Sequence, residues 1–131
     1  MKNLVALKKY LVANGVNCIF IILSQLNRAI ETPERSNNCY LHYPNKNDIF
    51  SASSVYYSSD YVLIIHKPCL IDGISEWYGP PTKGNPRGLP VYNPQNQEQP
   101  MIYLHLIKER FGLPKILAML DYLENSRIEE A

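Results

Sequence analysis

The stretch that decides the predicted fold is VNCIFIILSQLNR, residues 16–28, in which a largely apolar run is followed by polar residues. Such a run is typical of a strand buried on both faces, as in a parallel sheet covered by helices. Before it, Leu4, Leu7 and Leu11 recur at helical spacing and Gly15 supplies a stop. A surface helix, a glycine turn and a buried strand together predict an α/β protein.

Two further strands are predicted at residues 60–66 and 101–108, which are rich in β-branched and aromatic side chains. A short helix capped by Asn47 or Asp48 is expected to end near Ser58. Residues 31–47 are expected to form a loop. Residues 67–100 contain too many prolines and glycines for a regular element and predict a long irregular loop. Near the C-terminus, helical periodicity favours a helix over residues 115–123.

The composition describes one globular domain or a piece of one, with 131 residues, 46% hydrophobic residues and a formal net charge of +1. A balanced charge gives no global field, so any DNA contact must be local. The longest apolar run, residues 18–23, is too short to cross a bilayer. We therefore expect a cytoplasmic protein without a membrane partner. Three cysteines without paired spacing predict free thiols.

Two groups of polar residues are candidates for chemistry on a phosphate. Gln25 follows the first predicted strand, where its amide could sense a phosphate or a water. Lys108 and Arg110 end a later strand, and extended geometry points both side chains the same way. Such a pair could stabilise a transferring phosphoryl group. The alternatives are a capped turn around Gln25 and a solvated strand end in which Glu109 pairs with one of the cations.

A third set, Cys39-x-x-His42 with His66-x-x-Cys69, contains ligand types that build tetrahedral zinc sites. Against zinc, His66 lies inside an apolar strand and the order of ligand types is reversed between the pairs. We expect buried thiols and ordinary histidines, and no metal ligand in this chain.

The sequence contains no Gly-x-x-x-x-Gly-Lys-Ser/Thr phosphate loop, and no predicted strand ends in an acidic residue placed to hold magnesium. On its own, the chain therefore has no complete active site. Whether it is an enzyme depends on what accompanies it.

Taken together, three segments resemble the DnaB-type replicative DNA helicases. Residues 24–28 match the family's Ser-Gln-Leu-Asn-Arg, and residues 108–112 match its Lys-x-Arg-x-Gly. Residues 48–60 align without a gap with its Asp-Leu-Arg-x-Ser-Gly-x-Ile-Glu-Gln-Asp-Ala-Asp. The resemblance covers nearly the whole chain and implies the C-terminal half of a RecA-like ATPase domain of P-loop NTPase type. The implied fold is α/β, with a mostly parallel sheet flanked by helices.

The resemblance also assigns roles to residues. Gln25 would sense the γ-phosphate, while Lys108 and the arginine finger Arg110 would reach the nucleotide held by a neighbouring subunit. ATP and Mg²⁺ would bind to the complete protein, a homo-hexamer around single-stranded DNA, and not to this chain alone. The phosphate loop, the magnesium ligands and the catalytic glutamate would lie upstream of Met1. A strand, and not a helix, is implied for residues 115–123, and we follow that implication.

Phe50, Ser51 and Ser53 would face the DNA backbone according to the resemblance. This chain has Phe50, Tyr56 and Ser58 where the family has an arginine, a glutamate and an aspartate. Contact would then depend on backbone amides and on the hydroxyls of Ser51 and Ser53.

Two alternatives remain at this stage, a non-catalytic remnant that binds helicase subunits or DNA, and a small zinc-binding module. Half of a sheet also exposes an edge strand, so we expect the isolated chain to be marginally stable or to associate.

Overall fold

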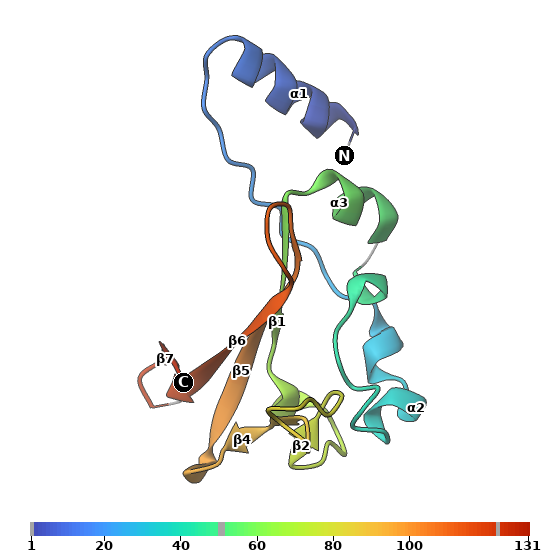
Figure 1. Cartoon of the computed structure of the whole chain (residues 1–131), viewed down its shortest axis with the longest axis vertical. Coiled ribbons are helices and arrows are strands. Elements are labelled where there is room, and N and C mark those ends of the chain that lie inside the picture. Colours follow the sequence, from blue (N-terminus) through green and yellow to red (C-terminus); the bar gives the residue numbers. More distant parts are fainter. Residues whose placement is uncertain (1, 50–51, 123) are drawn as a thin grey trace.

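A curled antiparallel sheet forms the centre of the protein in this computed structural model, which describes residues 2–49, 52–122 and 124–131 (Figure 1). Four strands follow one another in the order β1-β5-β6-β7, and every neighbouring pair is antiparallel. The short strand β4 pairs separately with β5. Their bounds are β1 Tyr61–His66, β4 Tyr92–Asn93, β5 Asn96–Glu109, β6 Lys115–Tyr122 and β7 Arg127–Glu130.

The prediction of a mostly parallel sheet flanked by helices, as in a RecA-like core, is therefore wrong for this chain. Residues 16–23 are extended but form no strand, and Ile19 and Leu23 are 90% and 93% exposed. A strand buried on both faces needs neighbours on both sides, and the described part of the chain places none beside this segment. The strands that do form are joined as a meander, which requires antiparallel pairing.

The C-terminal segment forms strand β6, as the family resemblance implied, and not the helix that its periodicity favoured. Ile116, Leu117 and Ala118 pair with His105, Leu104 and Tyr103 of β5. Leucine and alanine tolerate either conformation, so the hydrogen bonds and side-chain contacts offered by β5 decide the outcome.

The helices agree more closely with the sequence. Helix α1 (Lys2–Ala13) ends where Gly15 adopts a positive φ of 75°, as predicted. Helix α3 (Ala52–Ser58) ends at the expected residue. Asn47 and Asp48, the predicted caps of this helix, belong instead to a separate 3-10 turn, η2 (Lys46–Asp48), which Asn45 caps and in which Asp48 completes a capping box.

The segments expected to be irregular contain short elements. Residues 28–36 form η1 (Arg28–Glu31) and α2 (Pro33–Ser36), which lie beside the sheet (Figure 1). The long connection between β1 and β5 contains η3 (Pro68–Leu70) and a small hairpin of β2 (Trp77–Tyr78) and β3 (Leu89–Pro90). In the described part of the chain, no helix has the length and apolar content needed to span a membrane.

The core has two centres along the sheet. The lower cluster is built on Tyr78, Val91, Met101 and Tyr103, where the long connection packs against β5. The upper cluster is built on Ile49, Val62 and Ile64, and four partly buried side chains pack against it: Leu26, Val55, Tyr56 and Ile107. The upper cluster gathers segments from four separate parts of the sequence.

Candidate functional site

The three segments that carry the sequence motifs meet at the upper cluster. Leu26 comes from residues 24–28, Val55 and Tyr56 come from α3, and Ile107 directly precedes Lys108. Leu26 also forms an isolated antiparallel bridge with Ile49. Apolar packing therefore brings motifs that are more than 80 residues apart in sequence to one end of the sheet.

Lys108 is held against the C-terminal end of α3. Its Nζ donates hydrogen bonds to the carbonyl oxygens of Tyr56 at 2.7 Å and Tyr57 at 3.2 Å. The ammonium group also lies 5.1 Å from the centre of the Tyr56 ring. A cation at a helix C-terminus satisfies carbonyls that have no partner within the helix and interacts favourably with the helix dipole. Lys108 thus links β5 to the helix that the resemblance places near DNA.

Arg110 forms an ion pair with Asp60, and its own side chain remains 61% exposed. The backbone N–H of Arg110 also donates to the carbonyl oxygen of Asp60 at 3.0 Å. Asp60 accepts a second ion pair, from Lys8 of α1, at 2.8 Å. The hydrogen bonds from Lys8 and Arg110 hold the pKa of the Asp60 carboxyl below its usual value. Asp60 is therefore a shared counter-ion for two basic side chains.

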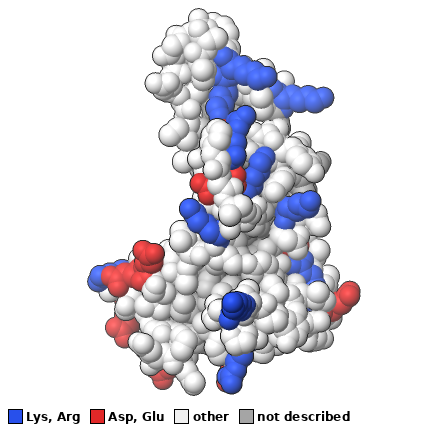
Figure 2. All heavy atoms as spheres, viewed as in Figure 1, with Lys and Arg blue, Asp and Glu red and all other residues white. Residues whose placement is uncertain are grey.

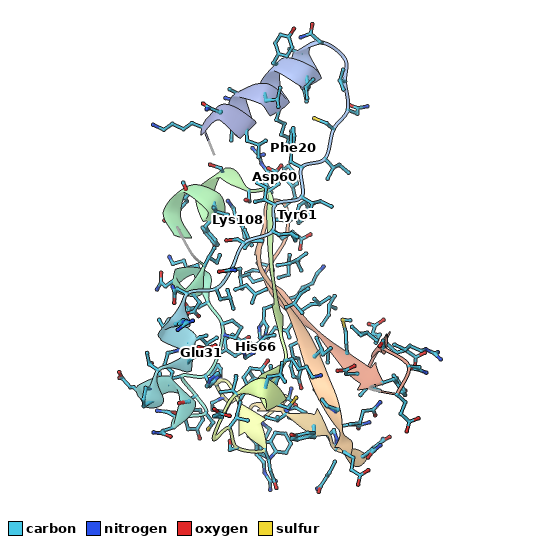
Figure 3. The ribbon with its side chains drawn as sticks, turned by 180° about the vertical axis from the view of Figure 1, so that it is seen from behind. Phe20, Glu31, Asp60, Tyr61, His66 and Lys108 are labelled. Atoms are coloured by element: carbon cyan, nitrogen blue, oxygen red, sulfur yellow. The ribbon has the colours of Figure 1, made fainter. Side chains whose placement is uncertain are left out.

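Lys108 reaches the last carbonyls of α3, and Arg110, in the turn after β5, reaches Asp60 between α3 and β1. Figure 3 shows Asp60 and Lys108 together at one end of the sheet, far from His66. Sequence reasoning missed Asp60 because its partners lie 50 and 52 residues away. Only the alignment of residues 48–60 with the family segment pointed to it.

Gln25 is exposed. The next two residues, Leu26 and Asn27, hold the backbone beside it in place. Leu26 is bound in the upper cluster. The backbone N–H of Asn27 donates to the carbonyl oxygen of Asp48 at 2.6 Å, and its Oδ1 accepts from the N–H of Ala29 at 3.0 Å. The side chain of Gln25 is thus presented to solvent next to an anchored turn. The prediction that Gln25 follows a buried strand is wrong, because residues 16–23 form no strand.

The structure describes only part of the predicted DNA-facing segment. Phe50 and Ser51 lie outside the described residues. The backbone of Ser53 belongs to α3, and its side chain also lies outside the described part. Helix α3 itself lies above the upper cluster, beside the connection that receives Lys108 and Arg110 (Figure 1).

A cleft of about 520 Å³ lies next to the motif segments, between η2, α3 and the hairpin of β5 and β6. Tyr43 and Tyr56 supply aromatic surface in its wall. Lys46 and Lys115, which are both exposed, also line it. Aromatic rings combined with cations are suited to nucleotide bases and the phosphates that join them.

Charge is unevenly distributed over the molecule. Lys and Arg side chains gather around α1 and the upper part of the face shown in Figure 2, and one of them, Lys8, forms an ion pair with Asp60. Residues 1–28 contain three lysines, one arginine and no acidic residue. The acidic side chains lie mostly toward the opposite end of the molecule. The motif end is therefore the end that attracts anions, although the net charge of the chain is only +1.

The donor set fits a phosphate better than a metal. Arg110 and Lys108 are hydrogen-bond donors of the type that binds nucleotide phosphates. The nearby carboxylates are engaged by cations, Asp60 by Lys8 and Arg110, and Asp48 by Arg35. The donors are thus of a type suited to a phosphate, and in the described part of the chain no group of three or more potential ligands is arranged to hold a metal ion.

The residues of the zinc alternative do not come together as four ligands. His42 and His66 stack with ring centres 5.9 Å apart, and all three cysteines are free thiols, as predicted. Among the described residues, no group of three or more potential ligands is arranged to hold a metal ion. The histidines instead belong to a buried aromatic cluster with His105 and Tyr78.

Comparisons with protein-family models, with curated proteins and with solved structures each find no match to this chain.

Proposed function

We propose that this chain is the phosphate-sensing and trans-acting part of an ATP-dependent DNA helicase of the DnaB type. The observation that carries the proposal is the convergence of the three motif segments on the upper cluster, which contains Leu26, Val55, Tyr56 and Ile107. The proposal depends on these segments and on their order in the sequence, and it requires no parallel sheet within the chain.

In this function, Arg110 acts on a nucleotide held by a neighbouring subunit. Its guanidinium is exposed and bound to a partly exposed carboxylate, and ion pairs near the surface are weak. A phosphate oxygen can therefore replace Asp60 as its partner, and Asp60 keeps the guanidinium oriented until then. Two forked hydrogen bonds from arginine are suited to the charge that develops on a transferring phosphoryl group.

Lys108 provides a mechanical connection between nucleotide and DNA. Its ammonium binds the last carbonyls of α3, so a phosphate that draws Lys108 away would release the end of that helix. Gln25 precedes Leu26, which packs in the same cluster as Val55 of α3. A change at either phosphate-facing residue would thus be transmitted to the segment that faces DNA.

Single-stranded DNA would lie along the cleft beside α3. Tyr43 and Tyr56 would contact bases, and Lys46 and Lys115 would contact phosphates. This arrangement compensates for the charged family residues that are absent from residues 50–58.

The test is complementation of ATP hydrolysis in trans. A DnaB-type helicase whose own finger arginine has been replaced by alanine is mixed with this chain, and DNA-stimulated phosphate release is measured. Because a finger arginine acts from the neighbouring subunit, the wild-type chain should raise hydrolysis on the order of tenfold or more. The Arg110→Ala variant should form the same complex without stimulating hydrolysis.

Arg87→Ala is the matched control, since Arg87 is an exposed arginine on the long connection, and it should stimulate like the wild type. Equal stimulation by wild type and Arg110→Ala would refute the finger assignment. A complex that forms without any stimulation would refute the catalytic role.

The second candidate is a subunit that binds DNA without supporting hydrolysis. The cluster of cations around α1 and the aromatic cleft favour this function, because neither feature needs a nucleotide. Two results together would support DNA binding without hydrolysis over the helicase function. Arg110→Ala would bind single-stranded oligonucleotides with undiminished affinity, and no variant would stimulate hydrolysis.

A further inference from the structure

The three histidines of the chain lie where the sheet meets a segment that covers part of it. This cover segment, residues 37–49, runs from the end of α2 through η2 to the upper cluster (Figure 1). His42 belongs to the cover segment, His66 to β1 and His105 to β5. The rings of His42 and His66 stack with centres 5.9 Å apart, and the rings of His66 and His105 are 6.1 Å apart. The histidines therefore connect the cover segment to two strands.

The middle of the cover segment is attached to its surroundings through this histidine cluster and the groups next to it. Tyr43 packs edge-to-face with His105, with ring centres 4.8 Å apart. The backbone N–H of Gly79 donates to the carbonyl oxygen of Cys39. Contacts on the histidine rings thus form a large part of this attachment.

Arg35 of α2 links the cover segment to itself. Its guanidinium donates to the carbonyl oxygens of Leu41 and Tyr43, each at 2.9 Å, and forms an ion pair with Asp48. These bonds join residues 35–48 to one another and would stay intact if the segment moved. The cover segment can therefore separate from β1 and β5 as one piece.

The rings of the cluster are poorly placed to carry a positive charge. Four buried ring nitrogens have no hydrogen-bond partner among the described residues: both of His42, and Nδ1 of His66 and of His105. The carboxylate of Asp48 acts on His42 and His66, but it is paired with Arg35, whose positive charge opposes protonation of both rings. Protonated rings at these distances would repel one another across the boundary between the cover segment and the sheet.

We propose that the three histidines form a pH-sensitive switch, which holds the cover segment on β1 and β5 while the rings are neutral and releases it when they are protonated. Tyr43 and Lys46 of the cover segment line the cleft beside α3. Release therefore removes one wall of that cleft. The switch does not depend on what the cleft binds.

The direction of the switch follows from burial. Burial lowers the pKa of His42, and it lowers the pKa of His66 and of His105 to about 4. Once the segment is released, the rings meet water and titrate near their ordinary pKa of about 6.5. Release therefore becomes up to about tenfold more favourable per histidine for each pH unit between 6.5 and 4.

The other ionisable groups around the cluster are neutral or paired. Burial raises the pKa of the phenols and the thiol packed there, so these groups are neutral in acid: Tyr43, Tyr78, Tyr103 and Cys69. The carboxylates of Asp48 and Asp121 form ion pairs with Arg35 and Lys67. The sequence has three histidines, and all three lie in the cluster. A transition between pH 6.5 and 5 therefore points to these rings.

The test is the distance between two spin labels, measured by double electron–electron resonance on the full chain with its three cysteines replaced by alanine. One label replaces Tyr40 of the cover segment and the other replaces Leu63 of β1, which are 55% and 56% exposed. A single short distance is expected at pH 7.5. At pH 5.0 a longer distance should appear, with a population roughly tenfold higher or more.

A second pair of labels reports on the sheet itself. These labels replace Leu63 of β1 and Leu117 of β6, which is 41% exposed. Their distance should be the same at pH 7.5 and 5.0, because the switch moves the cover segment and leaves the strands paired.

Replacing histidines should remove the response. His42→Phe combined with His66→Phe keeps two rings in the cluster and removes two protonation sites, so the short distance should persist at pH 5.0. Glu34→Gln is the matched control, since Glu34 is an exposed carboxylate on α2 next to the cover segment. It should respond to acid like the wild type.

Three results would overturn the switch. The wild type would keep the short distance down to pH 4.5, or both label pairs would lengthen together, as in general unfolding, or the folded double variant would open like the wild type. The wild-type measurements decide the question even if the double variant does not fold. None of these readouts involves nucleotide or DNA, so they stand apart from the test of the helicase function.

Discussion

At the scale of single residues, Asp60 organises the motif end of the molecule. It accepts ion pairs from Lys8 of α1 and from Arg110 after β5, and the hydrogen bonds from these two cations lower the pKa of its carboxyl. The carboxylate therefore neutralises part of the basic surface around α1. We infer that Asp60 limits the affinity of this end of the molecule for phosphates.

Replacing Asp60 by asparagine tests that role. Asp60→Asn keeps the side-chain shape and removes one negative charge beside two cations, so single-stranded DNA should bind roughly two- to fivefold more tightly. The melting temperature should change little, because the ion pairs are exposed. Fluorescence anisotropy with a labelled oligonucleotide at two salt concentrations measures the effect.

Glu98→Gln is the control, since Glu98 is an exposed acid at the far end of β5. It removes the same charge from the opposite end and should leave the affinity nearly unchanged. Equal tightening in both variants would show that net charge, and not Asp60, is responsible.

The histidines of the chain share one buried site in the lower half of the sheet. His42, His66 and His105 are 0%, 8% and 1% exposed, and the ring of His66 lies 5.9 Å from His42 and 6.1 Å from His105. The hydroxyl of Tyr78 lies 3.0 Å from Nε2 of His105. Burial lowers the pKa of His66 and of His105 to about 4, and the neighbouring His105 contributes to the shift at His66. The cluster is therefore stable only while its rings are neutral.

Acidification should destabilise the fold through these rings. In the unfolded chain a histidine protonates near its ordinary pKa of 6.5, whereas in the fold His66 and His105 resist protonation down to about 4. Their contribution to stability is thus complete above pH 6.5 and is lost as the pH falls toward 4. The slope should be on the order of 1 kcal/mol per pH unit for each histidine. Urea unfolding at pH 7.5, 6.5, 5.5 and 4.5 measures it.

His66→Phe removes one titrating ring while keeping a ring in the cluster. Burial also lowers the pKa of His42, so the slope should fall by about a third to a half. Tyr57→Phe, at a position that is 72% exposed, should keep the wild-type slope. A slope that is the same in His66→Phe and in the wild type would show that other groups control acid sensitivity.

At the scale of elements, the sequence predicts two kinds of element. They are helices whose stability depends on nearby residues and strands that are rich in β-forming residues. Helix α1 could be predicted because its leucine spacing and its glycine stop lie within 15 residues. Strands β1 and β5 could be predicted from their β-branched and aromatic residues. Strand β6 could not be predicted from periodicity, because the same leucines fit a helix and only pairing with β5 selects the strand.

Residues 16–23 show a different limit. Their apolar run predicted a strand between two covered faces, and the chain does extend there, but it provides no neighbouring strand and no covering helix. An apolar pattern indicates that a segment favours burial. It does not indicate whether other segments of the same chain bury it. The residues of this segment therefore stay exposed in the described part of the chain.

At the scale of the whole molecule, the predicted topology is wrong, and the role of the predicted site residues stays a prediction. Apolar runs do not report strand direction, so a parallel sheet was inferred where short connections and one long one produce an antiparallel meander. Lys108 belongs to β5 and Arg110 to the turn after it, and the two side chains bind neighbouring groups, the carbonyl oxygens at the end of α3 and the carboxylate of Asp60. Asp60 and the cleft were not predicted, because they arise from contacts between distant segments.

The features suited to phosphate binding are concentrated at one end of the sheet, the motif end. One end of the sheet carries the three motif segments, the shared counter-ion and most of the basic side chains around α1. The other end carries the hairpin of β4 and β5 and the acidic strand β7. The proposed phosphate recognition therefore concerns one end of a single sheet.

The most direct test is nuclear magnetic resonance of the isotope-labelled chain during titration with a single-stranded oligonucleotide. The account predicts that backbone amide signals of residues 24–28, 52–60 and 108–112 shift together, that the shifts weaken as salt is added, and that residues 93–99 are unaffected. Shifts confined to the 93–99 hairpin or to β7, or no shifts at a saturating oligonucleotide concentration, would contradict the claim that the three motif segments form one phosphate-binding site.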